Sequence, residues 1–110
     1  MIDLTTVVPA QRAFRALADT TRCQILLHLE QRNMTIGEIT DCFPVTRAAI
    51  KKHLTILEEG DLITVQARGR HRINSLNPRG MKHAADWINH FSRFWDDRLM
   101  ALKEAVENDD

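Results

Sequence analysis

Six lysine and arginine side chains stand between Pro44 and Leu76 against three acidic ones, although the whole chain has no net charge. The six are Arg47, Lys51, Lys52, Arg68, Arg70 and Arg72. Guanidinium and ammonium groups bind phosphate oxygens, and they also donate to O6 and N7 of guanine. Basic charge gathered in one stretch of a neutral chain therefore indicates a nucleic-acid surface. For Arg68–Arg72 the alternative is an ordinary solvated turn.

A second group that could do chemistry consists of His83, Asp86 and His90. Their separations of three and four residues would bring them to one face of a helix, where they could ligate zinc. Histidines and carboxylates are also common on solvated helix faces. We therefore predict no metal site and no cofactor, and keep these three residues as the candidates to test.

The two cysteines, Cys23 and Cys42, have no metal-ligand spacing. Two thiols without a disulfide framework fit a reducing compartment, and we interpret both as small buried hydrophobes. A redox switch would need accessible thiols of low pKa, and the sequence leaves that possibility open. The chain begins with neither a basic segment nor a long apolar run, so we expect a cytoplasmic protein without a membrane partner.

Catalytic chemistry has little support in the sequence. The chain lacks a recognisable nucleophile with its base and orienting group, a glycine-rich phosphate loop, and any tyrosine. We therefore expect that the protein is not an enzyme.

The basic residues must be positioned by a helix over Thr46–Glu59. Thr46 can cap its start, and Gly60 suits a left-handed residue at its end. The apolar stripe at i, i+4 and i+7 consists of Ile50, Leu54 and Leu57. Arg47, Lys51 and Lys52 give the helix a basic N-terminal half, so it can bury one face and present the other to a DNA major groove.

A short helix should precede it, because Thr35 and Glu38 form a capping box and Pro44 ends the helix near Cys42. The connection to the next helix has about four residues, which is typical of a helix-turn-helix. His53, next to Leu54, is expected to be packed or hydrogen-bonded rather than a ligand.

Two more helices are expected before this unit. Pro9 suits the first turn of a helix to about Ala18, with Phe14 and Leu17 as its core side chains. Asp19 then caps a helix from Thr20 to about Gln31, whose apolar residues are Ile25, Leu26 and Leu29. Residues 1–8 are expected to be frayed, and Asn33 and Met34 to form a break.

After the helix-turn-helix, β-branched residues over Leu62–Ala67 predict a strand that returns as His71–Leu76 through the turn Arg68-Gly69-Arg70. Asn77 and Pro78 then start a long helix to about Val106. The helix has a wide apolar and aromatic face, which predicts a second copy of the chain as its partner. Among its residues are Met81, Ile88, Phe91, Trp95 and Leu102.

These elements predict a mainly α fold with a small β-hairpin: one winged helix-turn-helix domain over residues 1–110, with four helices, a two-stranded wing and a long C-terminal helix. The order of elements resembles the ArsR-type (ArsR/SmtB) winged-helix repressors. The phrases that resemble this family are FRALADTTRCQILLHL, TIGEI, FPVTRAAIKKHLTILEEGDLI and GRHRINSLNP. The resemblance extends over roughly residues 10–105. One small departure is Thr20, where many relatives have proline.

The resemblance implies a homodimer that binds an inverted repeat in a promoter and represses transcription. Its dimerisation helices would be residues 9–18 and 78–106, with Phe14 joining the apolar residues named above. The base-reading positions of the family correspond to Thr46, Arg47, Ala48, Lys51 and Lys52. Arg68, Arg70 and Arg72, which the resemblance places at the wing tip, would enter the minor groove or bind phosphate, and the backbone N–H of Thr35 would bind phosphate.

The family's Cys-x-Cys metal box aligns with Thr35 and Gly37, which supply no thiolate. The chain therefore resembles the subgroup that lacks this box, and the spacing of His83, Asp86 and His90 does not match the family's other metal site. An effector, the operator and the choice between repression and activation remain open. The alternative function is a dimeric winged-helix module that binds proteins and not DNA.

Overall fold

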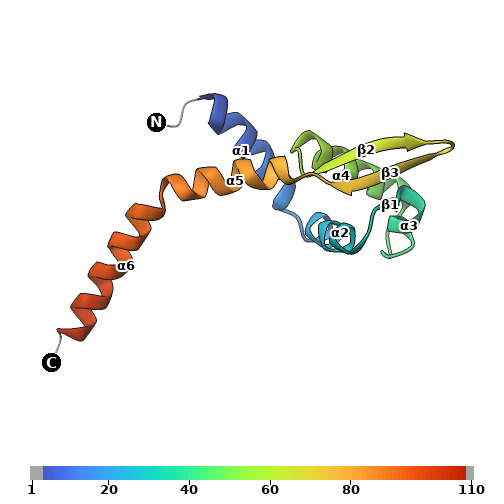
Figure 1. Cartoon of the computed structure of the whole chain (residues 1–110). Helices are drawn as coiled ribbons and strands as arrows, with labels where there is room; N and C mark the ends of the chain where they lie inside the picture. Colours follow the sequence, from blue (N-terminus) through green and yellow to red (C-terminus); the bar gives the residue numbers. More distant parts are fainter. Residues whose placement is uncertain (1–3, 109–110) are drawn as a thin grey trace.

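The computed structural model describes residues 4–108, which form six helices and three strands (Figure 1). In chain order the elements are α1 (Leu4–Leu17), α2 (Thr20–Gln31), β1 (Met34–Thr35), α3 (Ile36–Thr40), α4 (Arg47–Glu59), β2 (Ile63–Arg68), β3 (His71–Leu76), α5 (Pro78–His90) and α6 (Ser92–Glu107). The predicted mainly α fold with a small hairpin is confirmed. Asp109 and Asp110, part of the acidic C-terminal stretch, lie outside the described residues.

The helices and the hairpin form a body from which the C-terminal helix projects. In Figure 1, α2, α3 and α4 surround the base of the hairpin, α1 crosses α5, and α6 points away from all of them. The described chain measures 66 × 33 × 20 Å, which reflects this projection. No helix among the described residues is long and apolar enough to cross a membrane.

The core lies where α2, α3, α4 and the sheet meet. Its largest fully buried side chains belong to all of these layers and are Ile25, Ile39, Ile50, Leu57, Leu62 and Ile63. The predicted apolar stripes of α2 and α4 are all buried, so both predictions are confirmed. Burying these branched side chains on one face leaves the opposite face of α4 to solvent.

Helix α1 differs from the prediction in its start and in its core residues. Pro9 lies inside α1 and not in its first turn, because the helix already includes Leu4. Residues 4–8 are therefore helical rather than frayed, while residues 1–3 lie outside the described part. The fully buried side chains of α1 are Ala10, Ala13 and Ala16, whereas Phe14 and Leu17 are half-buried. Small side chains let α1 approach its neighbours closely.

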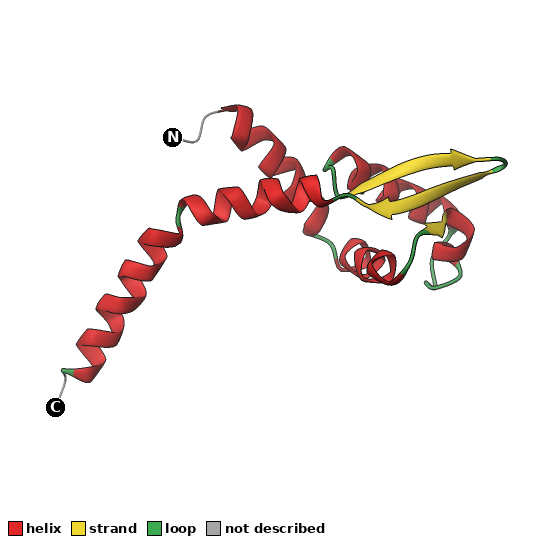
Figure 2. Cartoon of the chain, in the orientation of Figure 1, coloured by secondary structure: helices red, strands yellow, loops and turns green. Residues whose placement is uncertain are grey.

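The sheet has a third strand that the sequence did not predict. Met34, expected with Asn33 as a break, and Thr35, expected as a helix cap, pair with Asn74 and Ile73 of β3, so the strand order is β1-β3-β2. The predicted hairpin is present, with Ile63 opposite Leu76 and Arg68 opposite His71 (Figure 2). Asn74 is buried, and its side-chain Nδ2 donates to Met34 O at 3.1 Å.

Gly60 is not the left-handed residue that the sequence predicted. Its φ is −84°, and the residue with positive φ is Asp61, at 57°. A Cβ at Gly60 would come within 2.9 Å of Arg12 O. A Cβ at Gly80 would come within 2.7 Å of the carbonyl carbon and oxygen of Asp61. Both glycines therefore allow backbones to touch where α1, α4 and α5 converge.

The predicted single helix from Pro78 to Val106 is wrong, because the chain breaks at Phe91. Helix α5 ends at His90, and Phe91 has φ −98° and ψ 0°, outside the helical region. Helix α6 then starts at Ser92 without a side-chain cap. The ring of Phe91 packs edge-on against Trp87 and His90, with centroids 5.4 and 4.9 Å apart. The break redirects α6 away from the body (Figure 1).

Candidate nucleic-acid interface

The start of α4 presents the predicted base-reading side chains to solvent. Thr46 caps the helix, its Oγ1 accepting from the N–H of Ala49 at 3.1 Å. Thr46, Arg47, Ala48, Lys51 and Lys52 are all exposed. Because the apolar stripe of α4 is buried on the other side, the body holds these side chains on one outward face.

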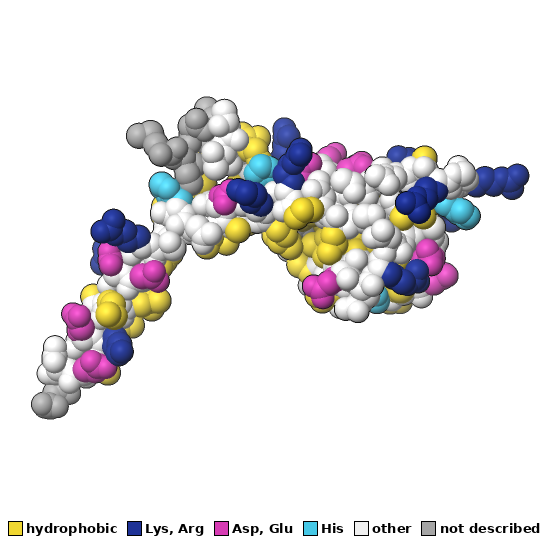
Figure 3. All heavy atoms as spheres, viewed as in Figure 1, with side chains coloured by type: hydrophobic (Ala, Val, Ile, Leu, Met, Phe, Trp, Pro, Cys, Tyr) yellow, Lys and Arg dark blue, Asp and Glu magenta, His cyan; other side chains and the backbone are white. Residues whose placement is uncertain are grey.

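The wing extends beside this face. Gly69 has φ +60°, a conformation that favours glycine, and it forms the tip together with Arg70. Arg68, Arg70 and His71 are exposed. Lys and Arg side chains extend past the end of the hairpin (Figure 3). His71 was not singled out from the sequence, although its place beside Arg70 in a basic turn could have indicated it.

A cleft of about 450 Å³ joins α3, α4 and the wing. It is lined by Thr35, Ile36, Gly37, Arg47, Arg70, His71 and Arg72. Residues far apart in the chain thus border one hollow, and four of them were predicted as DNA contacts. Three guanidinium groups around a single concave surface make it suited to a phosphate oxygen.

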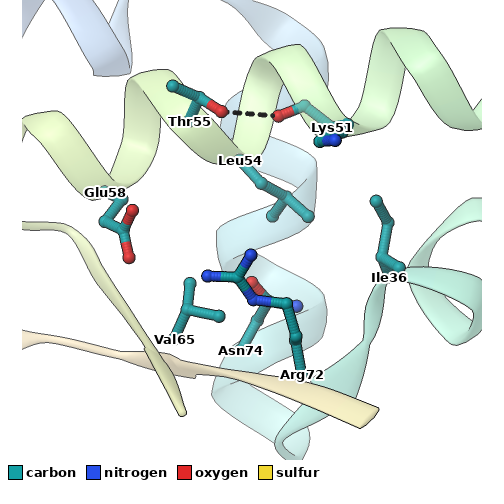
Figure 4. Close-up of a pocket in the computed structure, with 8 residues that line it drawn as sticks. All are labelled: Ile36, Lys51, Leu54, Thr55, Glu58, Val65, Arg72 and Asn74. Carbon is teal, nitrogen blue, oxygen red and sulfur yellow. Dashed lines mark hydrogen bonds between the residues drawn. The ribbon is translucent and has the colours of Figure 1, made fainter. Parts of the chain in front are cut away.

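Arg72 does not lie at the wing tip, where the sequence prediction put it. Alternation along β3 turns Arg72 to the same face as Asn74. Arg72 reaches toward α4 across a crevice of about 120 Å³, with Lys51 and Glu58 along the facing helix (Figure 4). No hydrogen bond or ion pair engages its guanidinium within the described part of the chain. Arg68 pairs with the residue that precedes Arg72, so alternation places it on the other face of the wing.

The capping box at the start of α3 is present. It engages the backbone N–H of Thr35, which is the group that was predicted to bind phosphate. The N–H of Thr35 donates to Glu38 Oε1 at 3.0 Å, and Thr35 Oγ1 accepts from the N–H of Glu38 at 3.2 Å. The hydrogen bond from Thr35, together with one from Arg32 at 2.7 Å, lowers the pKa of the Glu38 carboxyl to about 2. The Thr35 N–H is therefore engaged, although the residue borders the basic cleft.

The metal candidates of the C-terminal region do not form a site. No three histidine, cysteine or acidic side chains converge for a metal among residues 4–108. Asp86 instead pairs with Lys82 Nζ at 2.8 Å, and His90 packs against Phe91. His83 is half-buried. The three candidates thus have different surroundings along α5.

The cysteines occupy different environments. The Cys23 thiol is half-buried and donates to Leu17 O at 3.1 Å, at the end of α1. Cys42 is exposed, so the prediction that both are buried is wrong for this residue. Its thiol donates to Glu38 O at 3.4 Å. Each thiol therefore has a backbone carbonyl as its partner within the fold.

Helices α5 and α6 expose a long apolar face. The predicted interface residues Met81, Ile88, Phe91, Trp95 and Leu102 are 38–62% exposed, whereas Phe14 is half-buried in α1. No residue of α6 is buried. Apolar side chains line one side of this helix (Figure 3). These exposed side chains include the residues that the sequence analysis predicted as a dimer interface.

Comparison with known proteins finds the same architecture and a similar sequence in regulators of transcription. A family model described as a helix-turn-helix domain matches residues 17–66. The HTH-type transcriptional regulator Rv2034 of Mycobacterium tuberculosis is 31% identical over 98 residues, which cover 89% of each chain. The transcriptional repressor SdpR of Bacillus subtilis is 31% identical over 86 residues, covering 78% of this chain and 96% of its own.

Solved structures agree with these sequence matches. An ArsR-like transcriptional regulator from Rhodococcus sp. RHA1 superposes with a TM-score of 0.77 at 28% identity, covering 96% of this chain and 99% of its own. A possible transcriptional regulator for arsenical resistance superposes with a TM-score of 0.68 at 30% identity, covering 81% and 93% of the two chains.

Proposed function

Since this chain belongs to the ArsR-type family of winged helix-turn-helix regulators and is a DNA-binding transcriptional regulator, we propose that it acts as a homodimeric repressor on an inverted-repeat operator. The observation that carries this proposal is the convergence of Arg47, Arg70 and Arg72 on one cleft beside the exposed start of α4. The site of action is promoter DNA, so we assign the protein to the cytoplasm.

In this proposal α4 enters the major groove. Arg47, Lys51 and Lys52 lie on its exposed face and donate to guanine edges or to phosphates, while the methyl group of Ala48 meets a thymine methyl group. Thr46 contributes to this contact because, as the N-cap of α4, it lies at the end of the helix that carries the base-reading side chains. The sequence-specific part of binding comes from this helix, because base edges are readable in the major groove.

The wing supplies the sequence-independent part. Arg70 and Arg68 reach the adjacent minor groove or its phosphates, where the narrow groove concentrates negative potential. Arg72 has a different role, because it faces α4: with Lys51 it clamps a phosphate that lies between the recognition helix and the wing. Thr35 borders the neighbouring cleft, and because its N–H donates to Glu38, its hydroxyl group is the donor that would contact a phosphate there.

The exposed apolar face of α5 and α6 supports a homodimer. A single chain leaves Trp95, Leu99 and Leu102 between 57% and 62% exposed, and a two-fold partner would remove them from water. We propose residues 9–18 and 78–106 as the dimerising segments within the one domain. The two-fold axis would then set the α4 helices about one DNA turn, or ~34 Å, apart.

A binding experiment with matched variants tests this assignment. Arg47→Ala should weaken binding to the operator by about tenfold or more and weaken binding to random DNA less, since a base-reading arginine contributes about 1–3 kcal/mol of discrimination. Lys82→Ala is the control, because Lys82 is exposed on α5, pairs with Asp86 and does not line the basic cleft. Equal losses on both DNAs would assign Arg47 to phosphate contact, and absence of binding at low salt would favour a protein-interaction module.

A further inference from the structure

A polar cluster at the start of α2 joins three helices. Arg22 lies in the first turn of α2, and its Nε donates to Ala16 O at 2.8 Å. Its Nη2 donates to Arg15 O at 3.1 Å, so both contacts satisfy carbonyls at the end of α1. Its Nη1 lies 3.2 Å from Nδ1 of His53 in the middle of α4. One guanidinium therefore bridges the end of α1 to the helix proposed to read DNA.

A hydrogen bond between Arg22 and His53 requires one particular hydrogen position on the histidine ring. A guanidinium donates and never accepts, and it stays protonated in proteins. Nδ1 of His53 must therefore accept, which requires a neutral ring with its hydrogen on Nε2. This agrees with the sequence prediction that His53 is hydrogen-bonded rather than a ligand.

A second partner is available to the protonated form of the ring. Asp19 Oδ2 lies 3.8 Å from the same Nδ1, beyond hydrogen-bond distance but within ion-pair distance. The hydrogen bond from the N–H of Arg22 lowers the pKa of Asp19, so this carboxylate is charged throughout the range in which histidines titrate. A hydrogen on Nδ1 would repel Arg22 and attract Asp19.

The remaining charged groups near this contact lie along the groove between α1 and α4. Arg12, Arg15 and Glu59 line the adjoining hollow, and none of them has a hydrogen bond or ion pair with the His53 ring. The His53 side chain is 22% exposed, so water reaches it. Asp19 and Arg22 are thus the charged groups that compete directly for Nδ1.

We propose that Arg22 and His53 are positioning residues for DNA binding, and that protonation of His53 releases the recognition helix from the end of α1. The inference rests on the proposed function, in which α1 belongs to the dimer interface and α4 reads DNA. An operator with two half-sites requires both α4 helices at fixed positions. Losing the contact between Arg22 and His53 therefore lowers the affinity for the operator more than the affinity for random DNA. The protein accordingly reads its operator best when His53 is neutral.

The test measures operator binding against pH at constant ionic strength. The probe is a DNA site recovered from a random pool by the purified protein at pH 8, and random DNA of equal length is measured in parallel. Taking the ratio of the two affinities cancels any change with pH that affects binding to operator DNA and to random DNA equally. Between pH 8 and pH 5.5 the wild-type ratio should fall about tenfold, the size expected for loss of one charge-assisted hydrogen bond.

Matched variants separate His53 from the other histidines. His53→Asn keeps an oxygen acceptor near the place of Nδ1 but cannot titrate, so its ratio should stay within about twofold over the same pH range. His28→Asn is the control, because His28 packs against Phe43 toward the other end of α2, and it should behave like the wild type. A His53→Asn variant with the wild-type pH profile would overturn the proposal.

Nitrogen NMR of the free protein gives an independent test that needs no DNA. At pH 8 the His53 ring should show an unprotonated Nδ1 and a protonated Nε2, and lowering the pH should move the Arg22 Nε and Nη signals in parallel with the ring. A hydrogen on Nδ1 at pH 8 would overturn the proposal. If the NMR result holds while no DNA site is recovered, the proposed function fails and not the Arg22–His53 contact.

Discussion

Replacing Gly80 with alanine should destabilise the protein, although alanine is the better helix former. Gly80 lies in the first turn of α5, and a Cβ there would come within 2.7 Å of the carbonyl carbon and oxygen of Asp61. These are backbone atoms and cannot rotate away, so α5 must move outward. The same movement lengthens the 2.7 Å hydrogen bond from the Gly80 N–H to Asp61 O.

The opposing contributions can be weighed. Alanine gains about 1 kcal/mol over glycine in helix propensity. Forcing a methyl group into a filled space costs about 1–3 kcal/mol, and a weakened hydrogen bond costs about another 1 kcal/mol. The net effect of Gly80→Ala is therefore a loss of about 1–3 kcal/mol in the free energy of unfolding.

Gly37→Ala is the matched control, because it makes the same change inside α3, where the nearest atom is Thr35 Oγ1 at 3.9 Å. This variant should be neutral or more stable by up to about 1 kcal/mol. Urea unfolding measures both variants at one fixed protein concentration, because the apparent stability of the proposed dimer would depend on concentration. A Gly80→Ala protein as stable as Gly37→Ala would refute the close approach of α5 to the end of α4.

Three further predictions concern charge, assembly and pH. Arg70→Ala should reduce the slope of log affinity against log salt by about 0.9 per lost phosphate contact, whereas Lys82→Ala should leave it unchanged; fluorescence anisotropy between about 50 and about 200 mM salt decides. Trp95→Asp should convert the proposed dimer to monomers in sedimentation equilibrium and weaken operator binding, whereas Glu104→Lys, at an exposed position on the opposite side of α6, should not. The folded-state pKa of Glu38 is depressed to about 2, so its contribution to stability is present above pH 4.5 and is lost as the pH falls toward 2. Urea unfolding of Glu38→Gln should consequently vary less over that pH window than unfolding of the wild type.

Much of the DNA-facing unit was predictable because its determinants are local. The capping box of Thr35 and Glu38, the cap at Thr46 and the apolar stripe of α4 all depend on residues within one or two turns. The hairpin follows from the β-branched residues of its first strand and the basic turn after them. These features were sufficient for the fold class and for the exposed face of α4.

The features that sequence reasoning missed depend on contacts between distant segments. Gly60 suggested a left-handed helix end, but it is small because Arg12 of α1 passes close to it, and Asp61 adopts the positive φ instead. Arg72 seemed to belong to the wing tip until the register of β3 turned it toward α4. Strand β1 exists because Met34 meets Asn74, which lies far along the chain.

The break at Phe91 has a different cause. No glycine or proline interrupts residues 81–106, and an apolar periodicity runs through them, so local propensity favours one continuous helix. The observed break instead accompanies the packing of Trp87, His90 and Phe91 around the junction. Side-chain packing of this kind leaves no separate mark in the sequence.

Selection of DNA from a random pool by the purified protein tests the central claim most directly. The account predicts enrichment of an inverted repeat whose half-site centres lie about one helical turn, or ~10 base pairs, apart. Binding to that site should weaken steeply as salt rises, because several phosphates are neutralised. Failure to enrich any site at low salt would contradict the assignment of α4 and the wing as a DNA-reading surface.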